Sequence, residues 1–239
     1  MNSLDGLKIK IFADGADKES MLRMYSNPLI RGLTTNPTLM HKAGITDYKS
    51  FALDVLETIK DKPISFEVFS DDFQEMEDQA IEISSWAENV YVKIPITNTS
   101  KASSFELIRR LSYKKIKLNI TAIMTIDQLK GIVKVLDENT PTYLSIFGGR
   151  IADTGINPVP IFSQALNLFS DFQKVELIWA SPRELLNIFQ ADEIGCHIIT
   201  VTTDIINKLD LIGYDLEQFS LDTVKMFYSD AKSAGFTLE

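Results

Sequence analysis

The sequence predicts an α/β protein: a single (β/α)8 TIM barrel over residues 1–239, with an additional C-terminal helix over residues 215–234. Three observations lead to this prediction. Eight short runs rich in β-branched and aromatic residues recur along the chain, stretches with helical spacing of apolar residues separate them, and no linker or low-complexity segment interrupts the series. Strict alternation of this kind is typical of parallel strands with helices packed outside them.

The eight runs are the predicted strands. They lie at residues 8–14, 31–36, 63–69, 89–95, 116–121, 142–148, 175–181 and 197–202. Eight strand and helix units within about 200 residues suit a closed barrel better than an open doubly wound sheet. No GxGxxG or GxxxxGK[ST] phosphate loop follows any of the runs, so a dinucleotide-binding or nucleotide-binding fold is disfavoured.

Two helix starts carry chemical signals. Thr125 with Gln128 fits a capping box, and so does Ser181 with Glu184. Pro182 occupies a first-turn position, where proline is favoured. These signals predict helices that begin close to Thr125 and Ser181.

The C-terminal stretch DLEQFSLDTVKMFYSDAKSAG has the apolar spacing of an amphipathic helix beyond the eighth unit. Its apolar side chains are expected to cover one end of the barrel or a neighbouring subunit: Phe219, Val224, Met226, Phe227 and Tyr228. A homo-oligomer is therefore expected, and the number of subunits stays open.

Composition argues against several classes of partner. The chain has 24 basic and 33 acidic residues and a net charge of -9, so it offers no broad basic field to nucleic acid or to an anionic membrane. No apolar run approaches the roughly 18 residues that a membrane-spanning helix needs. We expect a cytoplasmic protein. His41 and His197 have no ligand-like spacing to other residues, so no metal site and no cofactor are predicted.

Polar residues stand where a barrel strand should be apolar. Barrel strands are covered on both faces and usually read as continuous apolar runs. The exceptions fall near the carboxyl ends of the first five predicted strands: Asp14, Asn36, Glu67, Lys93, Asn119 and Thr121. Side chains alternate along a strand, so Tyr91 shares a face with Lys93 and Asn119 shares one with Thr121. If these faces point inward, the polar groups converge where barrel enzymes carry out their chemistry.

Lys93 is the candidate nucleophile of this group. Burial disfavours the ammonium form of a lysine and favours the free amine, which can form a Schiff base. An equally compatible interpretation is that Lys93 reaches solvent or forms a structural ion pair with Glu67 or Asp14. Asp14 by itself would more simply cap the following loop. Two acids, a lysine and the Thr121 hydroxyl on inward faces together supply the groups for imine formation and proton transfer.

Nearly the whole chain resembles the transaldolase and fructose 6-phosphate aldolase family of class I aldolases. The resemblance rests on seven segments: FADGAD, GLTTNPTLMHKAG, SFEVF, VYVKIPIT, LNITAIMT, LSIFGGRIAD and WASPRE. TTNPT and VKIP in this order are specific, whereas GGR or SPRE alone would be weak signals.

This resemblance implies a role for each polar residue. Lys93 would attack the ketone carbon of a ketose phosphate and form the imine. Glu67 would shuttle protons through a water that Thr121 also holds, and Asp14 would take the proton of the C4 hydroxyl. The three-carbon unit that remains would be held by Asn36, Asn119 and Ser145.

The resemblance also implies a phosphate site after the sixth and seventh strands. Arg150, Arg183 and Ser181 would bind the phosphate, together with the amides of a helix that begins at Pro182. Phe147 precedes this site in the sequence. The alternatives are that Ser181 serves as the helix cap alone and that the arginines are solvated surface charges.

Two residues distinguish the chemistries within the family. Glu67 and Phe147 are typical of the transferase branch, where the aldolase branch carries Gln and Tyr. They imply transfer of a dihydroxyacetone unit from fructose 6-phosphate or sedoheptulose 7-phosphate to an aldose phosphate, as in the pentose phosphate pathway. Three alternatives stay open: reversible aldol cleavage, an unusual phosphorylated or sulfonated ketose as donor, and a barrel that binds a sugar phosphate without turning it over.

Overall fold

The computed structural model describes residues 4–238 and confirms the predicted (β/α)8 barrel. Its strands are all parallel and close in sequence order, with β1 paired to β8. They are β1 (Lys10–Asp14), β2 (Ile30–Thr34), β3 (Ile64–Glu67), β4 (Val90–Pro95), β5 (Leu118–Ile123), β6 (Thr142–Ile146), β7 (Val175–Trp179) and β8 (Ile198–Thr202).

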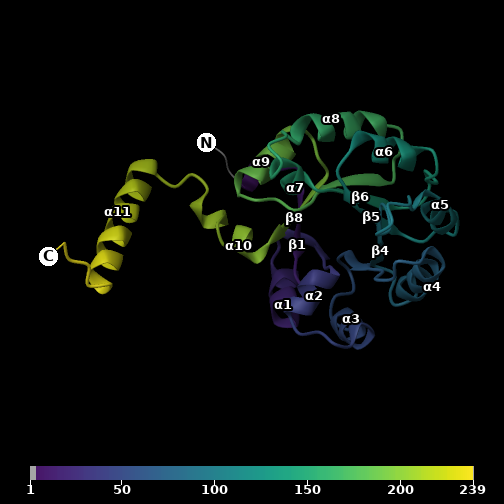
Figure 1. Cartoon of the computed structure of the whole chain (residues 1–239), viewed down its shortest axis with the longest axis horizontal. Helices are drawn as coiled ribbons and strands as arrows, with labels where there is room; N and C mark the ends of the chain where they lie inside the picture. The colour runs from purple at the N-terminus through teal and green to yellow at the C-terminus, as the bar shows by residue number, and fades with distance from the viewer. Residues whose placement is uncertain (1–3, 239) are drawn as a thin grey trace.

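Helices surround the strands and return the chain from the end of one strand to the start of the next (Figure 1). The helical elements are η1 (Leu4–Gly6), α1 (Lys18–Ser26), α2 (Pro37–Lys42), α3 (Tyr48–Leu56), α4 (Phe73–Ser84), α5 (Phe105–Tyr113), α6 (Ile126–Val133), α7 (Gly148–Ala152), α8 (Val159–Leu168), α9 (Leu186–Glu193), α10 (Thr203–Ile206), η2 (Leu209–Leu211) and α11 (Leu216–Ser233).

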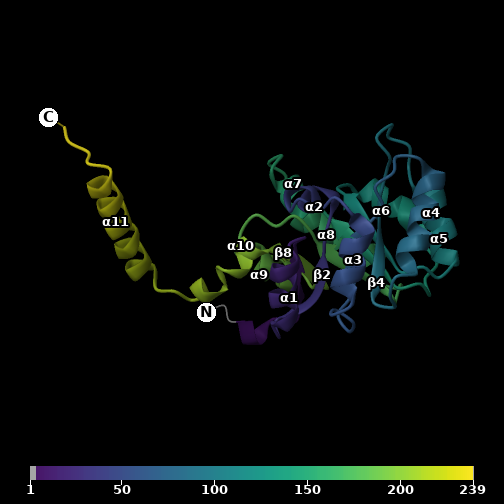
Figure 2. The same cartoon turned by 90° about the horizontal axis from the view of Figure 1, so that it is seen from below.

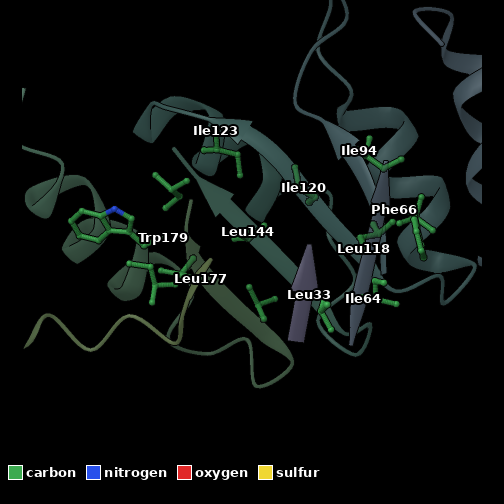
Figure 3. Packing of buried hydrophobic residues seen from close by; sticks show 14 of the residues in the cluster. Leu33, Ile64, Phe66, Ile94, Leu118, Ile120, Ile123, Leu144, Leu177 and Trp179 are labelled. Carbon is green, nitrogen blue, oxygen red and sulfur yellow. The ribbon is translucent and has the colours of Figure 1, made fainter. Parts of the chain in front are cut away.

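The main hydrophobic core lies between the strands and this helical layer. Figure 3 shows its strand residues from close by, among them Phe66 and Ile94, which are fully buried. Because side chains alternate along a strand, the neighbours Glu67 and Lys93 point to the barrel interior, where they line a cavity. The predicted alternation of inward and outward residues is therefore confirmed for β3 and β4.

A second apolar cluster fills the barrel interior below the polar residues. Tyr91 stacks on Tyr143 with ring centroids 4.0 Å apart, and Phe12 meets Tyr143 edge-on at 5.7 Å. Phe12 and Tyr91 each precede an inward polar residue, Asp14 or Lys93, by two positions on the same strand. The aromatic rings thus form an apolar floor beneath the polar groups.

Several predicted boundaries need correction. The second, third, sixth and seventh strands each end two residues earlier than predicted, so Asn36 lies beyond β2 as the N-cap of α2. The predicted capping box of Ser181 is wrong, because α9 begins only at Leu186 and Ser181 has a φ of 57°, outside the extended region that an N-cap adopts. The capping box of Thr125 at the start of α6 is confirmed.

The predicted C-terminal helix is present as α11, and it does not cover the barrel. It stands apart from the barrel in Figure 1 and in the perpendicular view of Figure 2. None of its residues is buried. Between residues 4 and 238, no helix is long and apolar enough to cross a membrane.

Gly32 makes room for the aromatic floor, and we predict that Gly32→Ala destabilises the protein. A methyl group at Gly32 would lie 2.5 Å from the Phe12 ring, which strand and floor hold in place. Overpacking of this kind costs about 1–3 kcal/mol, measurable as a lower urea midpoint with an unchanged slope. Gly15→Ala is the control, since nothing lies within 4 Å of the added methyl. Equal stability of the two variants would contradict the prediction.

Candidate active site

The cavity at the carboxyl ends of the strands has a volume of about 560 Å³. It is lined by Asp14, Thr34, Asn36, Pro37, Thr38, Leu39, Lys42, Glu67, Lys93, Thr121, Ala122, Ser145, Phe147, Arg150, Ala180, Ser181, Pro182, Arg183, Thr200 and Thr202. Of the predicted site residues, Asn119 does not line it, and the structure brings all the others together. This is the end of a barrel at which ligands bind.

Lys93 lies at the bottom of the cavity and is 6% exposed. Its Nζ atom donates a hydrogen bond to the backbone oxygen of Thr35 at 2.9 Å and lies 3.0 Å from Oε2 of Glu67. Lys93 and Glu67 are paired in register on adjacent strands, so the strand geometry brings the amine and the carboxylate together. Of the alternatives for Lys93, the ion pair with Glu67 is present, and the side chain does not extend to bulk solvent.

The backbone of Glu67 is held by Tyr48, a half-buried residue of α3. The Tyr48 hydroxyl donates to the Glu67 carbonyl at 2.8 Å and accepts from the Glu67 amide at 2.8 Å. The Tyr48 ring packs against Phe66 and Trp86. Burial raises the pKa of the Tyr48 hydroxyl, so it remains a neutral donor. The strand end that carries Glu67 is therefore anchored on both sides of the residue.

A row of hydrogen-bonded side chains crosses the barrel beside Lys93. Ser145 donates to Oδ1 of Asn119 at 2.7 Å, and Nδ2 of Asn119 donates to Ser65 at 3.0 Å. Asn119 is buried beneath the cavity, so in this structure it orients Ser145 rather than lining the surface. The buried hydroxyl of Thr121 has no partner in the described part of the chain. Such a group needs a water or a ligand atom to satisfy it.

Asp14 ends β1 at the edge of the cavity. Its Oδ1 accepts a hydrogen bond from the Thr34 hydroxyl at 2.8 Å. Burial raises the pKa of the Asp14 carboxyl above its ordinary value, while the charge of Lys93 and the Thr34 hydrogen bond act in the opposite direction. The simpler interpretation of the sequence, in which Asp14 caps the following loop, is wrong. The Oδ1 atom of Asp14 is directed to Thr34 on the neighbouring strand.

Asn36 reaches the cavity from the start of α2. Its Oδ1 accepts a hydrogen bond from the Leu39 amide at 3.0 Å and caps the helix. Pro37 at the first helical position suits this turn, because its missing N–H would have no helical acceptor. The cap holds the Asn36 side chain at the cavity wall.

The two predicted phosphate-binding arginines lie at the rim. Arg150 in α7 stands over the Phe147 ring, with its guanidinium carbon 5.4 Å from the centroid. Arg183 forms a bidentate pair with Asp153, with Nε 3.1 Å from Oδ1. A methyl group on Gly149 would overlap the Ser181 carbonyl oxygen, so this glycine lets the two rim loops meet. The predicted helix amides at Pro182 are absent from the rim, because α9 starts later.

Comparisons with known proteins identify the family of this chain. Residues 11–238 match the family described as Transaldolase/Fructose-6-phosphate aldolase. The chain belongs to this family. A protein named probable transaldolase from Dehalococcoides mccartyi is 32% identical over 203 residues, which cover 84% of this chain and 90% of the relative. Another of that name from Methanococcus maripaludis is 31% identical, over 90% of this chain and 97% of the relative.

Several residues that line the cavity or support its side chains were not predicted as part of the site. Thr35 acts through its carbonyl oxygen, which no sequence pattern marks. Tyr48 lies on a helix distant from the strand ends, and only packing brings it to Glu67. Thr34 and Thr200 occur in threonine-containing strands, and β-branched residues are common in strands, so their hydroxyls gave no separate signal. Ser65 shares a face with Glu67, and that alternation was a usable signal.

The cavity therefore brings together the Lys93 amine, two carboxylates and several hydroxyl groups, with two arginines at its rim. An amine with a carboxylate at hydrogen-bond distance can form and hydrolyse an imine, and a second carboxylate can move another proton. Among the described residues, no group of three metal-ligating side chains is present.

Proposed function

We propose that the protein is a transaldolase-type transferase that moves a dihydroxyacetone unit from a ketose phosphate to an aldose phosphate through a Schiff base on Lys93. The observation that carries this proposal is the buried Lys93 amine, 3.0 Å from the Glu67 carboxylate, in the cavity of a transaldolase-family barrel. A buried amine flanked by an acid has the means to add to a ketone and then to expel water.

In the first step the Lys93 amine attacks the C2 carbonyl of the donor and forms a carbinolamine. Glu67 transfers the proton that the carbinolamine hydroxyl needs in order to leave as water. The unpartnered hydroxyl of Thr121 supports a place for the water that carries this proton. The product is a protonated imine between Lys93 and C2.

In the second step Asp14 takes the proton of the C4 hydroxyl. The bond between C3 and C4 breaks, its electron pair moves toward the imine, and an aldose phosphate leaves. The raised pKa of Asp14 supports this role, because a stronger base accepts a hydroxyl proton more readily. The three-carbon enamine stays on Lys93.

The enamine is held until an acceptor aldehyde arrives, and the steps then run in reverse. Asn36 and Ser145 line the cavity, and Asn119 orients Ser145 by accepting its hydrogen bond at 2.7 Å. Fixing the enamine in this way converts the second addition into a well-oriented encounter. Sugar phosphates are the proposed partners, and the cytoplasmic location stays a prediction.

The rim supports a phosphorylated substrate. Arg150 lines the cavity, and Arg183 lines it as well while paired with Asp153. A phosphate dianion would compete with the Asp153 carboxylate for the Arg183 guanidinium, which binds both groups in the same bidentate manner. Ser181 lines the same cavity and would add a hydroxyl.

Glu67 and Phe147 support transfer over simple cleavage, since these residues are typical of the transferase branch. A second candidate, reversible aldol cleavage of fructose 6-phosphate, uses the same imine and differs in the fate of the enamine. An unusual phosphorylated or sulfonated ketose as donor would use the same rim. This donor class stays open because the residues near Arg150 and Pro182, which line the rim, depart from the pattern typical of the family.

We also propose that the protein is a homo-oligomer whose α11 packs on a neighbouring subunit. The side chains of Leu216, Val224, Phe227 and Tyr228 are 60–80% exposed on a helix that stands off its own barrel. A contiguous apolar surface of this kind marks an interaction site.

The proposed function leads to three predictions, and the first of them concerns the covalent step. With fructose 6-phosphate and borohydride, mass spectrometry should detect a three-carbon adduct on the Lys93 peptide that disappears when erythrose 4-phosphate is supplied. Lys93→Met should abolish the adduct, whereas Lys42→Met, which alters the second lysine of the cavity wall, should retain it. Free dihydroxyacetone without acceptor dependence would indicate the aldolase chemistry. Absence of any adduct on Lys93 would overturn the proposal.

The second prediction concerns the phosphate. Arg150→Ala should raise KM for a phosphorylated donor roughly 10- to 100-fold, because a charge-assisted contact is lost, and should affect unphosphorylated fructose much less. Asp153→Asn should lower KM by removing a competitor for Arg183. Arg109→Ala is the control, since Arg109 pairs with Glu106 on an exposed helix surface away from the cavity. Equal effects on both donors would contradict a phosphate role.

The third prediction concerns α11. Analytical ultracentrifugation should show an oligomer for the full chain and a shift toward monomer for Phe227→Asp, because a buried charge would oppose the contact. Lys225→Glu on the same helix is the control and should change the distribution little. A monomeric unmodified chain would refute the oligomer proposal without affecting the catalytic one.

A further inference from the structure

Two threonine hydroxyl groups, from the strands on either side of β1, are connected to Asp14 by hydrogen bonds. Thr34 in β2 donates to Oδ1 of Asp14 at 2.8 Å, and the hydroxyl oxygens of Thr34 and Thr200 lie 2.6 Å apart. Thr200 belongs to β8, so β1, which carries Asp14, runs between the two threonine strands. Thr200 is 7% exposed and lines the cavity. The three polar groups therefore form one connected row in the cavity wall.

The direction of this row follows from counting hydrogens. Each threonine hydroxyl has one hydrogen to donate. The Thr34 hydrogen is directed to Asp14, so the contact between the threonines is made by the hydrogen of Thr200. Hydrogen bonds in series that end on an anion strengthen one another, because each donor is polarised by the next. The row therefore acts on the carboxylate as a unit.

We propose that Thr200 is a positioning residue that orients the Asp14 carboxylate through Thr34. The inference rests on the proposed function, in which Asp14 accepts the C4 hydroxyl proton. The row engages Oδ1, and within residues 4–238 no hydrogen bond reaches Oδ2. Oδ2 is thereby the oxygen left for the substrate proton. Without Thr200, the Thr34 hydroxyl can rotate, and the carboxylate loses its fixed orientation.

The row also balances the other groups that face Asp14. Lys93 from β4 favours the carboxylate by its positive charge, Glu67 from β3 disfavours it, and burial disfavours it most. Thr34 and Thr200 are the uncharged groups from β2 and β8. Loss of this hydrogen-bonded row would destabilise the charged form of Asp14 relative to the protonated form and so raise the pKa of Asp14 further. Asp14 would then act as a base only at a higher pH.

The test compares Thr200→Val with Thr200→Ser. Valine keeps the branched shape and lacks the hydroxyl, whereas serine keeps the hydroxyl. Thr200→Val should lower kcat for donor cleavage roughly tenfold, which corresponds to one hydrogen bond of typical strength, and should move the acid limb of the kcat profile to higher pH. Thr200→Ser should restore both. Thr142→Val is the matched control, because it removes a buried strand hydroxyl at the opposite end of the barrel.

Borohydride trapping separates this inference from the proposed function. The unmodified protein must first show an adduct on Lys93; without one, the proposed function fails and takes this inference with it. With an adduct present, Thr200→Val should still form the imine but accumulate the uncleaved donor, so the ratio of six-carbon to three-carbon adduct should rise. An unchanged ratio and an unshifted acid limb, or a serine variant that behaves like valine, would overturn the role of Thr200 and leave the Lys93 mechanism standing.

Discussion

The structure depends on placing an amine and its compensating groups inside a barrel. A buried ammonium is costly unless it is paired and hydrogen-bonded. Lys93 meets this need with the Glu67 carboxylate at 3.0 Å and the Thr35 carbonyl at 2.9 Å. Parallel register brings Glu67 opposite Lys93, and the chain that follows β2 supplies the carbonyl. The pairing of β3 with β4 and the turn after β2 therefore supply the partners that a buried amine needs.

The apolar floor strengthens the electrostatic contacts of these polar groups. Phe12, Tyr91 and Tyr143 pack below the polar layer and keep it apart from the opposite end of the barrel. Electrostatic contacts are stronger where water is excluded, so Lys93 and Asp14 influence each other more than they would at a surface. The same packing makes Gly32 necessary, since the Phe12 ring occupies the space that a side chain there would take.

Most of the barrel and of its polar site could be predicted from the sequence, because side chains alternate along strands and polar residues gather at the strand ends. Inward placement of Glu67 and Lys93 follows from a period of two, and their meeting follows from the parallel barrel. The rest depends on tertiary contacts. The carbonyl of Thr35 has no sequence signature, and the hydroxyl of Thr200 becomes meaningful only because β8 closes beside β1. Ser181 misled the prediction of where α9 begins, since its capping pattern is local whereas its close approach to Gly149 is a tertiary contact.

The backbone is strained at two residues of the cavity wall. Ala122 and Ser181 both line the cavity with positive φ values, of 60° and 57°, a conformation that disfavours residues with a side chain. Ala122 lies where the register between β5 and β6 shifts, next to the unpartnered hydroxyl of Thr121. Such strain persists only when the surroundings determine it, and it concentrates at functional sites. A regular β5 would pair more fully with β6; in the irregular one, the consecutive residues Thr121 and Ala122 both line the cavity.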